Sequence, residues 1–261
     1  MSFVFNNFFY EPLLNFLIWL IKILPFHDIG VAVIILTIIV RLIIFPFTHK
    51  ATVAQNKMKT LEPELKDIKE KFKKDNQEQA KKTMELYKKH GINPLTSFVV
   101  LLVQLPIIYA LFKIFRNGAN FDPSHLYSFT LVPEYINMKF LGLIDIGQKS
   151  YFLAVAAAVT QFFQMKLAMP LIKDLGGKTG SFKDNLAKSM SIQFKYVMPV
   201  MIFFIAGQFV SAVALYWTTM NIFATVHEII VKRQLKNPKN NGTASTDNKK
   251  YFGRNSQPIG S

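Results

Sequence analysis

The chain has 261 residues, of which 51% are hydrophobic, with 25 phenylalanines against 16 acidic residues. The apolar residues are clustered in long runs, which excludes an ordinary soluble domain, and the absence of cysteine excludes disulfides and thiolate metal sites. The net charge of +15 suits nucleic acid, but a membrane topology accounts for much of it, and contact of a basic tail with ribosomal RNA stays open.

Residues 6–28, NNFFYEPLLNFLIWLIKILPFHD, lack the basic start and the small-residue cleavage site of a signal peptide. Their apolar stretch of 14 residues is short for a membrane span. At 100° per residue, Glu11, Asn15 and Lys22 fall on one narrow polar stripe. We therefore expect residues 1–28 to contain an amphipathic helix that lies in the outer membrane interface, with a sixth span as the alternative.

The following part of the chain contains five predicted membrane spans, several of which are short for that role. The last apolar run, residues 196–226, is too long for one span, and Gly207-Gln208 near its middle predicts the turn of a tight helical hairpin. We place the spans at about residues 30–48, 94–115, 150–170, 194–208 and 210–231, which gives a core over residues 29–235.

Basic residues alternate between the connections of these spans. The connection 49–93 has twelve lysines, whereas 117–149 has two, and the next connection and the end of the chain are basic again. Because basic loops stay in the cytoplasm, this pattern predicts an N-terminus outside and a C-terminus in the cytoplasm. The polar residues 236–261 are predicted to form a disordered basic tail.

Residues 55–91 form the main polar element. An apolar stripe recurs at spacings of four, three and four residues, is interrupted at 75–77, DNQ, and then resumes until Gly91 ends the pattern. Two short amphipathic helices of this kind predict a cytoplasmic hairpin, for which a solvated connector is the alternative. A connector could be far shorter, so we expect a docking surface made of Leu61, Leu65, Ile68, Phe72, Met84 and Tyr87.

Five segments, taken in order, resemble one family of membrane proteins: IIVRLIIFPF, KMKTLEPELKDIKEKFKKD, MELYKKHGINPL, QLPIIYALF and LYWTTMNIF. Their order and spacing resemble the YidC-type membrane protein insertases, bacterial members of the superfamily that includes the mitochondrial Oxa and chloroplast Albino proteins. The resemblance covers about residues 10–235. It implies an all-α polytopic protein of the bacterial plasma membrane, with five transmembrane helices around a hydrophilic groove and a cytoplasmic helical hairpin.

The resemblance also implies a function. The protein would insert and fold nascent membrane proteins, alone or with the Sec translocon, and would contact the ribosome and the lipid bilayer. No enzymatic activity, cofactor or small-molecule substrate is expected. The chain departs from the family where Thr96 to Val100 replace a frequent Gly-Cys-Leu-Pro, and it has neither a large periplasmic domain nor a lipobox cysteine. These differences blur the lineage and leave the core function intact.

Arg41 lies in the middle of an apolar run, TIIVRLIIFPF, and the predicted spans hold no intramembrane carboxylate to pair with it. Burying a charge without water or an ion-pair partner costs too much free energy. The side chain therefore either extends towards Lys50 or faces a water-filled cavity. Each amide in the other spans could alone be an interhelical hydrogen bond. Together they favour a wet groove, and they are Gln104, Gln161, Gln164 and Asn221.

The resemblance implies further groove residues. Arg41 corresponds to the intramembrane arginine of the family and Thr37 to a neighbouring threonine. The aromatic groove positions correspond to Phe45, Tyr216 and Trp217, although tyrosine is frequent where Phe45 stands.

The expected mechanism follows from the groove. A polar flank of the substrate is hydrated partway across the membrane, acidic residues are attracted to Arg41, and the apolar segment slides along the third and fifth spans into lipid. A membrane potential, negative inside, then favours outward release of each acidic residue by about 2.3 kcal/mol per 100 mV.

Two other function classes fit the sequence less well. An intramembrane protease needs paired aspartates, a Ser/His pair or a metal motif, and the sequence has no H-E-x-x-H, with histidines scattered near the interfaces. A small-anion transporter could use a lone arginine and stays the alternative, although inverted repeats would be expected and five spans with one hairpin show none.

Overall fold

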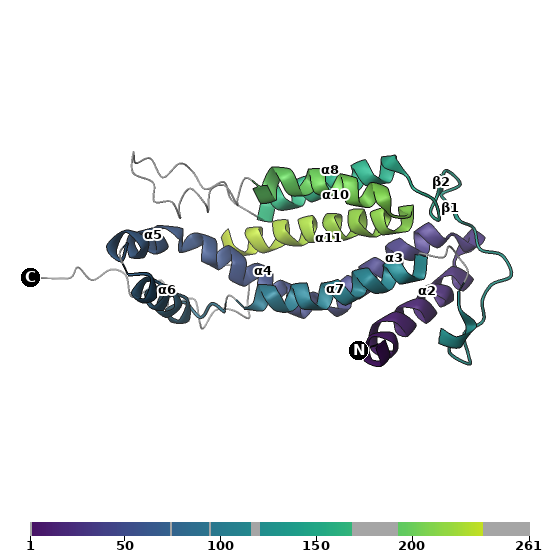
Figure 1. The fold of residues 1–261 in the computed structure, drawn as a ribbon, viewed down its shortest axis with the longest axis horizontal. Coiled ribbons are helices and arrows are strands. Elements are labelled where there is room, and N and C mark those ends of the chain that lie inside the picture. Colours follow the sequence, from purple (N-terminus) through teal and green to yellow (C-terminus); the bar gives the residue numbers. More distant parts are fainter. Residues whose placement is uncertain (1, 74, 94, 116–120, 169–192, 237–261) are drawn as a thin grey trace, which may run out of the picture.

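The computed structural model describes residues 2–73, 75–93, 95–115, 121–168 and 193–236. Most of these residues are helical, so the prediction of a mainly α-helical protein is confirmed. The predicted tail after residue 236 and most of the connection 171–193 lie outside the described residues. Figure 1 shows long helices running roughly along one axis, with α5 and α6 at one end and the strands near the other.

The helices are α1 (Ser2–Phe5), η1 (Asn6–Tyr10), α2 (Glu11–Ile23), η2 (Pro25–His27), α3 (Ile29–Ile43), α4 (Phe45–Thr60), α5 (Glu62–Lys71), α6 (Asn76–Lys89), α7 (Thr96–Phe115), η3 (Pro123–His125), α8 (Tyr151–Ala168), η4 (Gln193–Val197), α10 (Met198–Gln208) and α11 (Ser211–Lys236). Strands β1 (Lys139–Phe140) and β2 (Ile144–Asp145) pair antiparallel, with Lys139 opposite Asp145. Helix α11 is central, because it contacts α3, α4, α7, α8 and α10.

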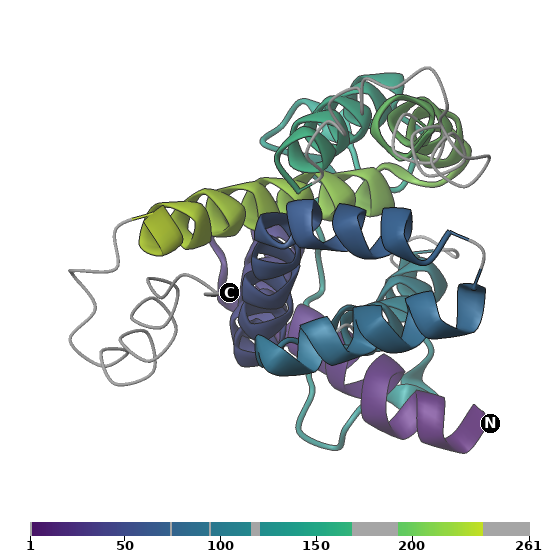
Figure 2. The same ribbon diagram turned by 90° about the vertical axis from the view of Figure 1, so that its left-hand side faces the viewer.

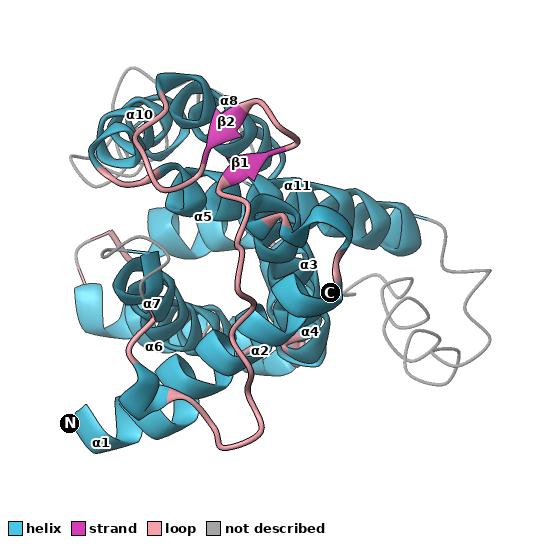
Figure 3. Cartoon of the chain, turned by 90° about the vertical axis from the view of Figure 1, so that its right-hand side faces the viewer, coloured by secondary structure: helices cyan, strands magenta, loops and turns pink. Residues whose placement is uncertain are grey.

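The N-terminal helical segment, within the predicted residues 1–28, has the length of a membrane span. Helical backbone runs over Phe3–Ile23, and these 21 residues are long and apolar enough to cross a membrane by length and composition. Asn15 of the predicted polar stripe is buried. Its side chain donates to His125 O at 3.0 Å and accepts from Tyr127 N at 2.8 Å. The connection 121–150 crosses α2 in Figure 3, so it covers part of this stripe. An interfacial position of the helix stays a prediction.

The first predicted span, 30–48, is broken in the structure. α3 and α4 meet at Ile44 with a bend of 68°. Asp28 begins α3, because its carboxylate accepts the backbone N–H groups of the first turn at 2.8 and 3.0 Å. Pro46 lies in the first turn of α4, where its ring prevents α3 from continuing straight.

Other spans also differ from the prediction in length. By length and composition, two described helices can cross a membrane, or three if the bent pair counts as one span. The second of them is Tyr151–Ala168, and Leu102–Phe115 and Lys195–Gln208 are shorter apolar helices. The total of five spans therefore stays a prediction. The predicted turn after Gly207-Gln208 coincides with a break, because α10 ends at Gln208 and Phe209 is extended.

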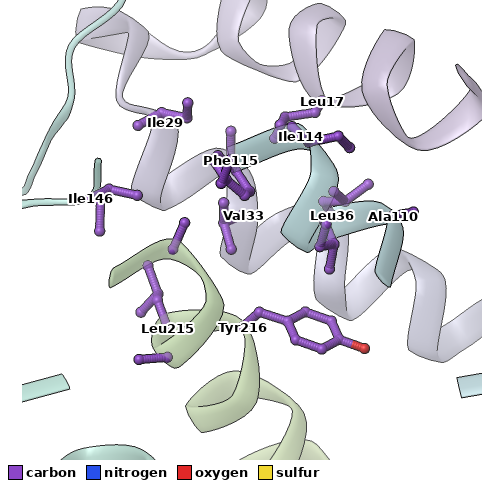
Figure 4. Packing of buried hydrophobic residues seen from close by; sticks show 14 of the residues in the cluster. Leu17, Ile29, Val33, Leu36, Ala110, Ile114, Phe115, Ile146, Leu215 and Tyr216 are labelled. Atoms are coloured by element: carbon purple, nitrogen blue, oxygen red, sulfur yellow. The ribbon is translucent and has the colours of Figure 1, made fainter. Parts of the chain in front are cut away.

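An apolar core fills the end of the bundle where α3, α8 and α11 begin and α7 ends, which we call the apolar end. Figure 4 shows side chains of α3, α7 and α11 meeting there, with Leu17 of α2 above them. Small residues allow α8, α10 and α11 to approach closely, as is usual for helices packed in lipid. These buried small residues are Ala154, Ala157, Ala206, Ala212 and Ala214.

The opposite end of the bundle, the hairpin end, carries α5 and α6, which are nearest the viewer in Figure 2. Pro63 lies in the first turn of α5, and the Asp75 carboxylate caps α6 by accepting two backbone N–H groups at 3.0 Å. Most of the predicted docking residues pack inward instead of forming one outer surface: Leu61 is buried, Phe72 is half-buried, and Leu65, Ile68 and Tyr87 pack against Leu61, Leu86 and Ile92. Met84 remains exposed.

Candidate functional site

Arg41 lies in the last turn of α3 and is half-buried. Its Nε atom is buried without a hydrogen-bond partner. Among the described residues, no carboxylate forms an ion pair with this guanidinium, while the Tyr216 phenol lies within electrostatic range of it. The water-filled cavity expected around Arg41 stays a prediction.

Helices α3, α7 and α11 each carry a buried polar side chain in this part of the bundle. Tyr216 of α11 and Gln104 of α7 are both buried, and the Gln104 side-chain amide donates a hydrogen bond to the Tyr216 hydroxyl. Thr37 lies one turn before Arg41 and is buried, with its hydroxyl donating to Val33 O at 2.6 Å. In Figure 4 the Tyr216 ring stands at the edge of the apolar core and its hydroxyl points away from α11. We call Arg41, Gln104 and Tyr216 the arginine cluster.

The remaining predicted groove residues lie on α8 and α11. Asn221 is buried, and its amide nitrogen lies 3.4 Å from both Ala157 O and Thr160 Oγ1. This interhelical contact agrees with the alternative that each amide joins two helices. Gln161 is buried on α8, whereas Gln164 and Trp217 are half-buried.

Phe45 takes part in an aromatic group that the sequence does not predict. Its ring centroid lies 4.8 Å from that of His227 and 5.5 Å from that of His49. His49 Nδ1 and His227 Nε2 are 3.1 Å apart, so one ring nitrogen donates to the other and the acceptor nitrogen carries no proton. A pocket of about 430 Å³ opens here, lined by Phe45, His49, Phe223, Val226, His227, Ile230 and Gln234.

A buried carboxylate joins α4 to α11 at the hairpin end. Oε1 of the buried Glu228 lies 3.0 Å from Asn56 Nδ2, 3.2 Å from Lys59 Nζ and 3.6 Å from Lys232 Nζ. Burial lowers the pKa of Lys59, and the charge of Glu228 opposes that shift. The only sequence signal for this cluster is a carboxylate and a lysine four residues apart on one helix, because Asn56 is 172 residues away from Glu228.

Buried polar and apolar side chains are separated along the bundle axis. Apart from Ser211, whose hydroxyl donates to Gln148 O, the buried side chains in the first turns of α3 and α11 are apolar. The other buried polar side chains begin at Thr37 on α3 and at Asn221 on α11. Among the described residues, no group of three or more His, Cys, Asp or Glu could hold a metal ion.

A family model and several known proteins match most of this chain. The family described as 60Kd inner membrane protein matches residues 19–239. A Fusobacterium nucleatum protein named membrane protein insertase YidC is 30% identical over 230 residues, which cover 87% of this chain and 98% of that protein.

Two further relatives carry the same name. The one from Clostridium tetani is 31% identical over 209 residues, covering 80% of this chain and 84% of its own length. The one from Wolinella succinogenes is 29% identical over 235 residues, which cover 90% of this chain but 39% of that longer protein.

Proposed function

Because the chain belongs to the 60Kd inner membrane protein family, we propose that it inserts and folds nascent membrane proteins in the bacterial inner membrane, alone or with the Sec translocon. The observation that carries this proposal is the family match over residues 19–239, together with relatives named membrane protein insertase. The alignment covers 98% of the Fusobacterium relative, so that protein has little sequence outside the part shared with this chain.

The substrate groove of this proposal begins at the arginine cluster. A buried guanidinium without a carboxylate needs water or neutral polar groups to be tolerated in a membrane. Gln104 and Tyr216 supply neutral groups. In the proposed groove, the polar residues of α8 and α11 towards the hairpin end would extend a path for water. The apolar end is closed by packed side chains, so the groove would open only towards the hairpin end and the lipid.

In this mechanism, the substrate is held by hydration and charge. A hydrated groove shortens the hydrocarbon distance of about 30 Å that a polar flank must cross. Arg41 attracts acidic residues of the flank, because its charge acts in a medium of low dielectric constant. The apolar segment leaves along α8 and α11 into lipid, and the reaction breaks no covalent bond.

The proposed topology places the hairpin end in the cytoplasm and the N-terminus outside, because the connection 49–93 carries twelve lysines. The hairpin would then meet the ribosome or the Sec translocon. Of the predicted docking residues, Met84 is the one that the fold leaves exposed, so it is the first position at which to place a crosslinker.

The test is complementation of bacteria depleted of their own insertase. We expect the wild-type chain and Arg41→Lys to restore growth and Arg41→Ala to fail, because Lys retains the positive charge. Arg233→Ala, an exposed arginine at the end of α11, is the matched control and should restore growth. Immunoblots of the membrane fraction establish that each variant accumulates. Failure of the wild-type chain contradicts the function in that host, whereas rescue by Arg41→Ala contradicts the role of the arginine.

A further inference from the structure

The tip of the β1–β2 hairpin has an unusual residue for its backbone conformation. Leu141 and Gly142 both have positive φ, 50° and 74°, and Leu143 N donates to Phe140 O at 3.0 Å. Turns of this shape prefer Asn or Gly, and a left-handed residue other than glycine costs about 1–3 kcal/mol. The side chains of Leu141 and Leu143 are 65% and 84% exposed, so internal packing does not offset this cost.

A second left-handed apolar residue lies close to this tip. Phe26 has φ of 60° and a side chain that is 83% exposed. Two residues later, the buried Asp28 accepts a hydrogen bond from Leu141 N at 2.8 Å through its Oδ2 atom. The same carboxylate caps α3 through Oδ1. One aspartate therefore fixes both strained segments to the start of α3, and each segment exposes a large apolar side chain.

Helix α8 also carries exposed apolar side chains. Tyr151, Val155, Val159 and Phe163 are exposed and recur every four residues, so they form one apolar face of α8. In a membrane protein, such a face lies against lipid. β2 ends six residues before α8 begins, and Figures 1 and 3 show the strands beside that end of the bundle.

We propose that Phe26, Leu141 and Leu143 form an outer anchor that enters the headgroup region of the outer leaflet. Side chains at such an interface lie about 5–10 Å into the headgroup and acyl boundary. The exposed Lys139 beside the tip suits anionic lipid headgroups. The anchor fixes the start of α3, and with it the apolar end, at the membrane surface. It rests on the topology proposed above, and it does not depend on insertion activity.

The test uses the absence of cysteine from the chain. Leu143→Cys and Phe26→Cys are labelled with an environment-sensitive fluorophore, and the full chain is reconstituted in nanodiscs of phosphatidylcholine and phosphatidylglycerol. Quenching is measured with a nitroxide lipid labelled near the glycerol and with aqueous iodide. We expect both labels to be quenched severalfold more by the nitroxide than by iodide. Glu134→Cys, an exposed polar site in the same connection, should show the reverse.

Two results would overturn the proposal. Labels quenched by iodide as strongly as the Glu134 label would place the tip in water. Labels protected from both quenchers would place it against protein, such as a second copy of this chain. The measurement reports position only, so its failure is distinct from a failure of complementation, which tests insertion. Circular dichroism of each labelled variant establishes that its helices are intact.

Discussion

The same helices pack in two different ways at the two ends of the bundle. On α3, Leu36 is 1% exposed within the apolar core, whereas Leu42, beyond Thr37, is 56% exposed. On α11, buried alanines and leucine precede Tyr216, and buried polar residues follow from Asn221 onwards. The apolar end is held by close packing, and the hairpin end is held by hydrogen bonds and ion pairs between α4 and α11.

This difference fits the proposed mechanism, in which the groove is closed on one side of the membrane and hydrated on the other. Lipid tails are as apolar as leucine, so the apolar end gains stability from contact distance and not from exclusion of water. The hairpin end must keep charged groups buried, and it does so by surrounding them with partners. Arg41 stands at the boundary between the two ends.

The largest expected loss of stability comes from a cavity in the core of the apolar end. Leu36→Ala leaves a cavity among α3, α7 and α11, for which soluble proteins lose about 2–5 kcal/mol, and we expect the lower part of that range because transfer from water contributes little here. Leu42→Ala makes the same change on an exposed part of the same helix and should have a small effect. Unfolding in mixed micelles by sodium dodecyl sulfate measures both. Equal losses would show that the two ends do not differ in packing.

Removing the buried Glu228 carboxylate should destabilise the hairpin end. Glu228→Ala removes the acceptor shared by Asn56 and Lys59, and losing a hydrogen bond to a buried charged group costs about 1.5–3 kcal/mol. Glu228→Gln keeps an acceptor oxygen, so its midpoint of unfolding should lie between those of wild type and Glu228→Ala. Glu85→Ala breaks the exposed pair with Lys82 and should leave the midpoint unchanged. No change in either Glu228 variant contradicts a stabilising role for the cluster.

The structural features that the sequence predicts depend on residues that are neighbours along the chain. The apolar spacings of residues 61–72, the position of Pro63 and the break after Gly207-Gln208 depend on near neighbours, and the helices begin and end accordingly. Arg41 is identifiable because an isolated charge in an apolar run needs no partner to be noticed. The wet groove expected around it stays a prediction.

The structural features that the sequence does not predict depend on hydrogen bonds between residues far apart along the chain. The polar stripe of α2 suggested contact with water, but Asn15 bonds to a residue 110 positions away. The His49–His227 pair and the Glu228 cluster join residues 178 and 172 positions apart. No periodicity in a single helix indicates such pairs. Leu65 and Ile68 of the predicted docking surface pack with Leu86 of α6, a contact that the spacing within one helix does not indicate. The docking role stays a prediction.

Close packing at the apolar end also leaves no room for a side chain at Gly30. A Cβ atom at Gly30 would lie 2.5 Å from Phe140 Cδ2 and 2.7 Å from its Cβ, so Gly30→Ala must displace β1 from α3. Overpacking of this kind costs about 1–3 kcal/mol. Gly207→Ala places its Cβ 3.5 Å from Tyr151 and should be tolerated. The difference between their unfolding midpoints is the measurement, and equal midpoints would contradict close packing of α3 on β1.

The smallest expected effect is a pH dependence of the free energy of unfolding that comes from Lys59 at the hairpin end. Burial lowers the pKa of Lys59 below its usual 10.5 in the folded protein, although Glu228 opposes the shift. Between the folded pKa and 10.5, the unfolded chain therefore holds a proton that the folded protein does not, so stability rises with pH in this window and levels off above 10.5. Below the folded pKa both states are protonated, and the cost of burying the charge is complete. Unfolding midpoints from neutral pH to 10.5 should rise more in wild type than in Lys59→Met, with the exposed Lys57→Met as control. A contribution of Lys59 that falls as pH rises would mean that its pair with Glu228 outweighs burial, and the hairpin end would then be held by charge attraction despite desolvation.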